Sequence, residues 1–197
     1  EDSKIIEVAS QHDVDIQIRN PNLAKDNTSM FDVLRSEIFK LNPVPEIVLL
    51  LQPTSPLRNT NQVKIALSYF LANLEQYDSL VSVETVPHKY NPAQVFISTA
   101  NGKKVILGKV NKLKALLTGK PYTEPTLSGV PISQRITRRQ DFPEAWIPDG
   151  NIYIFKSENL KSGSLYGNET MLMENEGTVN INSLEDWDNA EKLCVNK

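Results

Sequence analysis

The sequence contains only one cysteine, Cys194, among its 197 residues. A single cysteine forms no disulfide within the chain and supplies one thiolate, which excludes a disulfide scaffold and a cysteine-rich zinc site. Long hydrophobic runs are absent too. The longest, from Ile47 to Leu51, stops at Gln52, far short of the roughly 20 residues that a membrane-spanning helix needs. We therefore expect a cytoplasmic protein without a membrane-spanning segment.

The sequence also lacks an excess of charge of one sign, because 21 Lys and Arg residues stand against 24 Asp and Glu residues, a net charge of −3. The basic residues are scattered along the chain and form no stripe that would neutralise a phosphate backbone, which argues against nucleic-acid binding. The length of 197 residues suits one globular domain over residues 1–197, and 40% hydrophobic residues are enough to form its core.

Hydrophobic periodicity predicts alternating helices and strands in the first half of the chain. Val14, Ile16 and Ile18 alternate with polar residues, as in an edge strand, and apolar residues at spacings of three and four after Thr28 or Ser29, the candidate caps, predict a helix. The expected order is a helix at 2–12, a strand at 14–18, a helix at 31–41, a strand at 47–51, a helix at 63–74 and a strand at 80–86. A strand, a helix and a strand with short connections form a βαβ unit, so an α/β fold with a mainly parallel sheet is expected.

The second half of the chain has a different pattern. The dipeptide Asn101-Gly102 favours the positive φ angles of a tight turn, so the flanking segments 94–98 and 103–107 are expected to form an antiparallel ribbon. Residues 108–148 show no sustained periodicity and are expected to be long loops. The elements expected after them are a strand at 152–155, a strand at 179–181 and a helix that begins after Ser183 and ends near Leu193.

The loop after the strand at 47–51 is the first candidate site, because ligands of open α/β sheets bind beyond the carboxyl ends of the strands. It reads Gln52-Pro53-Thr54-Ser55-Pro56-Leu57-Arg58, in which two prolines restrict the backbone around two hydroxyl groups. From composition alone, a ligand-binding loop and a stiff connector between a strand and a helix are equally good interpretations.

The segment from Leu50 to Arg58 resembles the signature of the acylneuraminate cytidylyltransferases, the CMP-sialic acid synthetase family. Four further segments resemble motifs of that family in the same order: Arg19 through Leu23-Ala24 to Asp26, Arg139-Gln140-Asp141-Phe142-Pro143, Asp149-Gly150-Asn151-Ile152-Tyr153-Ile154 and Val179-Asn180-Ile181-Asn182. The resemblance implies a three-layer, Rossmann-like fold of the nucleotide-diphospho-sugar-transferase type. Its sheet would be mixed and mainly parallel, with an antiparallel dimerisation ribbon.

That family transfers CMP from CTP to a nonulosonic acid, a sugar acid of the sialic acid type, and releases pyrophosphate. The resemblance implies substrate-binding roles for Gln52, Arg139, Thr54 and Ser55 and nucleotide-binding roles for Arg19 and Ser29, and it assigns no catalytic residue. The Gln52 amide offers both a donor and an acceptor, and the guanidinium of Arg139 suits the sugar carboxylate. A homodimer is expected, in which an arm at residues 87–148 closes the sugar site of the partner.

The resemblance also implies Mg²⁺, which offsets the negative charge of phosphates and is normally held by carboxylates. The family pattern has Asp-Ile-Asp where this chain has Asn180-Ile181-Asn182, so two negative charges are missing. Amide oxygens also ligate Mg²⁺, but neutral ligands bind it more weakly. Asp149 replaces a family asparagine nearby and is a candidate to restore part of that charge.

A larger difference concerns the CTP-binding segment. Members of the family begin with a strand, a glycine loop with Lys and Arg that binds the triphosphate, a helix and a second strand, and Glu1-Asp2-Ser3 aligns after this segment. We therefore expect a truncated piece of a longer protein, without the first βαβ unit and unable to bind CTP productively alone. Two hypotheses follow: an enzyme completed by that segment, or a non-catalytic homologue or sugar-binding partner subunit that has lost metal-dependent activity.

Overall fold

The structure is a computed structural model that describes residues 2–91, 96–98, 104–106, 126–127, 130–131, 144–175 and 177–195. The chain divides into two compact units, one formed by Glu1–Ser82 with Asp149–Lys197 and one formed by Val83–Pro148. The predicted arm, residues 87–148, falls in the second unit. Within the described ranges, none of the helices is long and apolar enough to cross a membrane.

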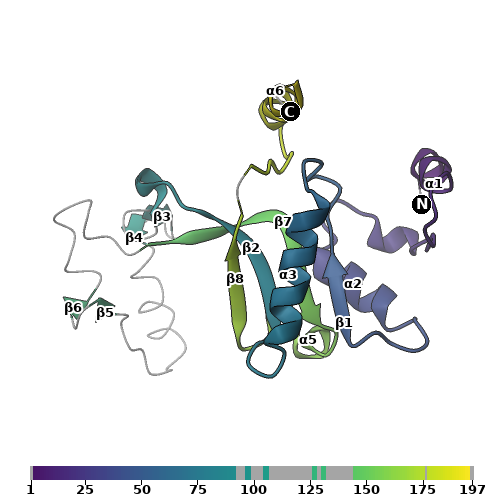
Figure 1. The fold of residues 1–197 in the computed structure, drawn as a ribbon, viewed down its shortest axis with the longest axis horizontal. Helices are drawn as coiled ribbons and strands as arrows, with labels where there is room; N and C mark the ends of the chain where they lie inside the picture. The colour runs from purple at the N-terminus through teal and green to yellow at the C-terminus, as the bar shows by residue number, and fades with distance from the viewer. Residues whose placement is uncertain are drawn as a thin grey trace. The chain divides into compact units, whose positions relative to one another are not determined.

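A four-stranded sheet forms the centre of the first unit (Figure 1). Its strands are β1 (Ile47–Leu50), β2 (Ser79–Thr85), β7 (Trp146–Lys156) and β8 (Thr170–Glu174), and their order across the sheet is β1-β7-β2-β8. β1 pairs antiparallel with β7, so that Ile47 lies opposite Lys156 and Leu50 lies opposite Tyr153. The predicted strands at 47–51, 80–86 and 152–155 are thus confirmed.

β7 separates the two strands of the predicted βαβ unit. The Lys156 N–H donates to the Asp78 carbonyl (3.0 Å) and the Val86 N–H donates to the Ala145 carbonyl (2.8 Å), so β2 is also antiparallel to β7. β1 and β2 therefore point in the same direction without being neighbours. The sheet is mixed, which confirms the predicted α/β class, and the two strands of the predicted βαβ unit are parallel to each other with β7 between them.

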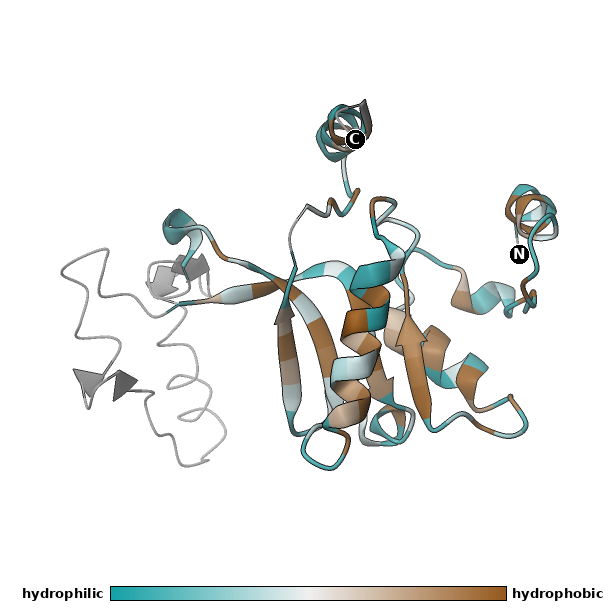
Figure 2. Ribbon diagram, viewed as in Figure 1, coloured by the Kyte–Doolittle hydropathy of each residue, from teal (hydrophilic) through white to brown (hydrophobic). Residues whose placement is uncertain are grey.

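Helices cover both faces of this sheet, which gives three layers (Figure 2). On one face, Ala66 and Phe70 of α3 (Thr60–Ala72) pack with Ile152 and Ile154 of β7. On the other face, Phe155 of β7 packs with residues of two further helices, α2 (Met30–Ile38) and α5 (Asn159–Ser162). Each of the buried Phe and Ile side chains among these residues contributes roughly 1.5–3 kcal/mol to stability by its burial. The strand β7 therefore takes part in two apolar cores, one on each face of the sheet.

Polar caps fix where the helices begin. The Ser29 Oγ accepts a hydrogen bond from the Asp32 N–H (3.1 Å), so of the two predicted caps Ser29 starts α2. Asn59 and Gln62 form a reciprocal capping box at the start of α3. Ser183 caps the last helix, α6 (Leu184–Val195), as predicted, and Asp2 caps the first, α1 (Ser3–Ala9), which is shorter than the predicted helix at 2–12.

Two predicted strands are wrong. Residues 14–18 are not in a strand, and Val14 and Ile18 are 59% and 66% exposed, because the described chain offers them no strand to pair with. The segment 179–181 is not a strand either. It makes one backbone hydrogen bond to the chain after β1, from the Ile181 N–H to the Thr54 carbonyl (2.8 Å), and the strand that precedes it, β8, was not predicted.

The second unit contains two small antiparallel ribbons. β3 (Phe96–Ser98) pairs with β4 (Lys104–Ile106), with Phe96 opposite Ile106, which confirms the predicted ribbon, although its turn at 101–102 lies outside the described residues. β5 (Thr126–Leu127) pairs with β6 (Val130–Pro131) inside the segment that was predicted to be loops. Short 3₁₀ helices occur at η1 (Pro21–Leu23) and, in this unit, at η2 (His88–Tyr90).

Asp78, just before β2, fastens the turn that leads into β8. Its carboxylate accepts hydrogen bonds from the backbone N–H groups of Asn168 (2.9 Å) and Glu169 (3.2 Å) and lies 3.3 Å from the Lys156 Nζ. These N–H groups, that of Asn168 first, and the Lys156 ammonium lower the pKa of Asp78 below its ordinary value of 3.8. The ionised carboxylate therefore stabilises the fold above that value, and the stabilisation is lost as the pH falls through the lowered pKa.

We predict that Asp78→Asn lowers the urea midpoint of unfolding at pH 7 and reduces the loss of stability on acidification below about pH 4. The measurement is urea unfolding followed by circular dichroism at several pH values. Asp188→Asn is the matched control, because it removes the same charge from an exposed position on α6. Equal midpoints and equal acid sensitivity in the two variants would contradict the role given to Asp78.

Candidate functional site

The loop between β1 and α3, residues 51–59, is held together by hydrogen bonds between residues near its two ends. The Gln52 carbonyl accepts hydrogen bonds from the Ser55 N–H (3.3 Å) and from the Arg58 Nη2 (2.8 Å). Among the described residues, the side-chain amide of Gln52 has no hydrogen-bond partner. Gln52 is one of the residues that line a cavity of about 380 Å³, together with Pro53, Ser55, Pro56, Arg58, Asn59, Thr60 and Val63. The loop thus presents a free amide on a fixed backbone.

Two further contacts fasten the middle of this loop. The Ser55 hydroxyl is buried, with the residue 2% exposed, and donates to the Gly150 carbonyl of β7 (3.0 Å). The Thr54 carbonyl accepts from the Ile181 N–H. Ser55, which the sequence proposes as a substrate ligand, therefore uses its hydroxyl proton on β7, and the substrate role of Thr54 and Ser55 stays a prediction.

Arg58 joins the end of the loop to β7. Its Nε donates to both the carbonyl oxygen (2.9 Å) and the side-chain Oδ1 (2.7 Å) of Asn151, a residue with no exposed surface. Burial lowers the pKa of Arg58 below its ordinary value, and the negative charge of Asp149 acts in the opposite direction. Sequence reasoning gave no role to Arg58 or Asn151, although both lie inside the quoted motifs.

Asp149 is a buried carboxylate whose two oxygens are both used by the protein. Its Oδ1 accepts from the Ser82 hydroxyl (2.5 Å) and the Asn151 N–H (2.9 Å), and its Oδ2 accepts from the Asn175 Nδ2 (3.2 Å) and the Thr178 hydroxyl (3.4 Å). Four donors satisfy the carboxylate, so the structure gives no support to Asp149 as a substitute metal ligand.

Gly150 lets the segment after β8 approach β7 closely. Its φ angle is +76°, and a Cβ at this position would clash with the side-chain amide of Asn180. The Asn180 Oδ1 is buried without a hydrogen-bond partner. Three segments that are far apart in the sequence therefore meet here: the loop 52–58, the part of β7 at 149–151 and the chain at 178–182.

The residues present offer a divalent cation only neutral oxygens at the two positions that the resemblance assigns to metal. The Asn180 Oδ1 is an unpaired acceptor of the kind that ligates Mg²⁺. Asn182 is exposed, and its N–H donates to the Asp186 carboxylate (3.0 Å). Within the described residues no group of three or more His, Cys, Asp and Glu side chains could hold a metal ion.

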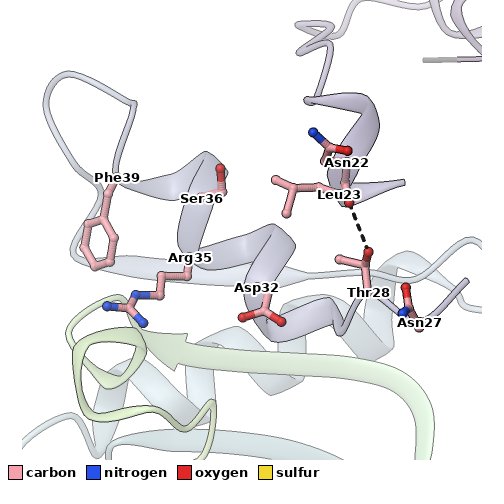
Figure 3. Close-up of a pocket in the computed structure, with 8 residues that line it drawn as sticks. All are labelled: Asn22, Leu23, Asn27, Thr28, Asp32, Arg35, Ser36 and Phe39. Carbon is pink, nitrogen blue, oxygen red and sulfur yellow. Dashed lines mark hydrogen bonds between the residues drawn. The ribbon is translucent and has the colours of Figure 1, made fainter. Parts of the chain in front are cut away.

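The remaining predicted site residues lie elsewhere in the chain. Ser29 uses its hydroxyl in the cap of α2, where it also donates to the Asp32 Oδ2 (2.6 Å). Arg19 is partly exposed before η1, and Arg139 lies outside the described residues. A second cavity, of about 630 Å³, lies beside α2 and η1 (Figure 3) and is lined by Asn22, Leu23, Asn27, Thr28, Asp32, Arg35, Ser36 and Phe39. The structure does not bring Ser29 into contact with the loop 52–58.

No family model matches the chain. Two curated relatives, both named N-acylneuraminate cytidylyltransferase, come from Streptococcus agalactiae, one from a serotype III strain and one from a serotype Ia strain. Each is 24% identical over 184 residues, which cover 92% of this chain and 38% of the relative. The chain thus spans well under half the length of these relatives, and its resemblance to the acylneuraminate cytidylyltransferases is confirmed.

A solved structure shares the fold. The CMP:2-keto-3-deoxy-manno-octonic acid synthetase complexed with CTP superposes with a TM-score of 0.61, at 12% sequence identity, over 100% of this chain and 78% of that chain. At this identity the likeness concerns the fold. It confirms the α/β fold that the sequence motifs imply.

We predict that Gly150→Ala destabilises the protein more than the same change at another glycine of positive φ. Gly163, at the end of α5, has a φ of +87° and nothing within 4 Å of an added Cβ, so Gly163→Ala measures the cost of the backbone conformation alone. We expect about 1 kcal/mol for Gly163→Ala and about 3 kcal/mol for Gly150→Ala, because the second methyl also displaces Asn180. Urea unfolding measures the free energy of unfolding of both variants. An equal decrease in the two would show that a Cβ at position 150 does not clash with Asn180.

Proposed function

We propose that this chain is part of an enzyme that transfers CMP from CTP to a nonulosonic acid and releases pyrophosphate. The names of the Streptococcus agalactiae relatives support this proposal, and so does the fold shared with a synthetase that has CTP bound. The observation that carries it is the loop 52–58, which leaves the Gln52 amide free beside a cavity while contacts within the loop and with β7 fix its backbone. The named relatives favour this enzyme over a non-catalytic homologue.

In this proposal the chain's own residues bind and orient the two substrates. The Gln52 amide donates to one sugar group and accepts from another, and Arg139 pairs with the sugar carboxylate. Arg19 and Ser29 bind the nucleotide. The substrates are CTP and a nonulosonic acid, the protein works as a homodimer in the cytoplasm, and the arm at 87–148 covers the partner's sugar.

Mg²⁺ belongs to the proposal because it offsets the charge that phosphoryl transfer spreads over the phosphate oxygens. In this chain Asn180 would provide its unpaired Oδ1, and Asn182 would provide a second amide oxygen. Both ligands are neutral, so the negative ligands of the cation would come from the triphosphate itself.

The proposal is tested by pyrophosphate release from CTP with a panel of nonulosonic acids, using the full-length protein that contains this chain. We expect release with one sugar of the panel. We further predict that Gln52→Ala raises the KM for that sugar about tenfold, as expected for the loss of hydrogen bonds to a substrate, and leaves the KM for CTP within about twofold.

Gln11→Ala, which truncates an exposed glutamine after α1, is the matched control and should leave both constants unchanged. A folded full-length protein that releases no pyrophosphate with any sugar would contradict the proposed reaction. Equal increases in both KM values for Gln52→Ala would contradict the role of Gln52 in binding the sugar.

The neutral metal positions generate a further prediction. The double change Asn180→Asp with Asn182→Asp adds two carboxylates, so the Mg²⁺ concentration that gives half-maximal activity should fall at least about threefold. Asn189→Asp adds a charge at an exposed position of α6 and should leave that concentration unchanged. The same Mg²⁺ dependence in all three proteins would show that positions 180 and 182 do not contact the cation.

A further inference from the structure

We propose that Arg58 and Asn151 form a positioning pair that fixes Gln52 and thereby sets the affinity for the sugar acid. The inference rests on the proposed function for the identity of the ligand. It concerns two residues that neither the sequence motifs nor the named relatives assign to binding. Asn151 acts through Arg58, and Arg58, which also lines the cavity beside Gln52, acts through the backbone carbonyl of Gln52.

The geometry of Arg58 carries the first step. Its Nη2 donates to the Gln52 carbonyl (2.8 Å), one bond from the Cα that bears the free amide, while its Nε donates to Asn151, 93 residues further along the chain. The guanidinium therefore links Gln52, near the start of the loop, to the strand β7. With that carbonyl fixed, the amide of Gln52 starts from a defined position.

Only an arginine can make this connection. The Nε and Nη2 of a guanidinium lie in one rigid plane and point in different directions, so one side chain serves two fixed acceptors at once. A lysine keeps the positive charge but has one nitrogen on a flexible stem. Arg58→Lys therefore removes the connection and leaves the charge in place.

Asn151 supplies the second step, because its orientation is fixed. The Oδ1 accepts from the Arg58 Nε (2.7 Å), which leaves the Nδ2 as the remaining donor, and this donor is buried without a hydrogen-bond partner. An unpaired buried donor costs stability. The Asn151 side chain thus carries an unpaired donor that disfavours folding, while its Oδ1 contributes the hydrogen bond with Arg58.

The Ser55 contact shows that the tie is specific to the end of the loop at Gln52. Ser55 donates to the Gly150 carbonyl and holds the middle of the loop on its own. Loss of the positioning pair therefore leaves the Gln52 carbonyl with only the longer hydrogen bond from the Ser55 N–H (3.3 Å), without releasing the whole loop. This separation predicts an effect on sugar binding that exceeds the effect on folding.

The test compares Arg58→Lys and Asn151→Ala in the full-length protein, by steady-state kinetics of pyrophosphate release with both substrates varied. We expect Arg58→Lys to raise the KM for the sugar about tenfold and Asn151→Ala to raise it about threefold, with the KM for CTP within about twofold and kcat little changed. Arg35→Lys, on α2, and Asn189→Ala, at an exposed position of α6, make the same chemical changes elsewhere and should change nothing.

A double-mutant cycle separates positioning from a general structural role. If Arg58 acts through Gln52, Arg58→Lys should have little effect on the sugar KM in a Gln52→Ala background. An equal effect of Arg58→Lys in both backgrounds would overturn the proposal. Equal increases in the KM for sugar and for CTP, or an unchanged sugar KM in both single variants, would overturn it as well.

Hydrogen exchange measured by mass spectrometry tests whether Arg58 and Asn151 hold the loop in place, and this test does not depend on enzymatic activity. We expect faster exchange in peptides that cover residues 50–59 for Arg58→Lys and Asn151→Ala, with unchanged exchange in α3. If the protein releases no pyrophosphate, the proposed function fails, and this exchange pattern alone then supports or overturns the tie between the pair and the loop. Exchange identical to that of the unmodified protein would overturn it.

Discussion

Burying the carboxylate of Asp149 requires that its oxygens receive hydrogen bonds, because a buried polar group without partners costs about 1–3 kcal/mol, and a charged one costs more. The donors come from three parts of the chain: the hydroxyl of Ser82 on β2, the N–H of Asn151 on β7, and the Asn175 and Thr178 side chains after β8. The path of the chain after β8 is therefore set by one carboxylate on the central strand.

The part of β7 that follows Asp149 holds the loop after β1 in place. Because Gly150 adopts a positive φ, the strand carries two adjacent carbonyl groups that accept side chains of the loop, Gly150 from Ser55 and Asn151 from Arg58. The same network reaches the other end of the loop. Asn175, which donates to Asp149, accepts from the side chain of Gln62 in the capping box of α3 (2.8 Å). Loop, strand and helix are thus fixed by connected polar groups rather than by packing alone.

The sequence predicts what depends on local pattern and fails where a distant partner decides. The apolar spacing of residues 31–41 after Thr28 or Ser29 predicts α2, because a helix makes its hydrogen bonds within one segment, although the observed helix ends at Ile38. The alternation at 14–18 has no neighbour to pair with in the described chain, so it forms no strand. Among the candidate site residues, the motif points to the loop and to Gln52, whose role in binding stays a prediction. The contact of Arg58 with Asn151 joins positions 93 residues apart, which no local pattern reveals.

Charge balance then constrains how the site could meet two anionic substrates. Arg58, which is partly buried, donates to neutral oxygens of Gln52 and Asn151, and the negative charge of Asp149 acts on it, so these two opposite charges together offer little net positive charge to a ligand. Asn180, in place of a carboxylate, adds no repulsion toward phosphates but also attracts a cation less. Under the proposed function, binding of the sugar carboxylate and the triphosphate must therefore rely on cationic groups outside the loop, with Gln52 recognising the sugar by shape and hydrogen bonding. A neutral recognition loop depends on accurate placement far more than a charged one does, because hydrogen bonds weaken steeply with misalignment whereas charge attraction does not.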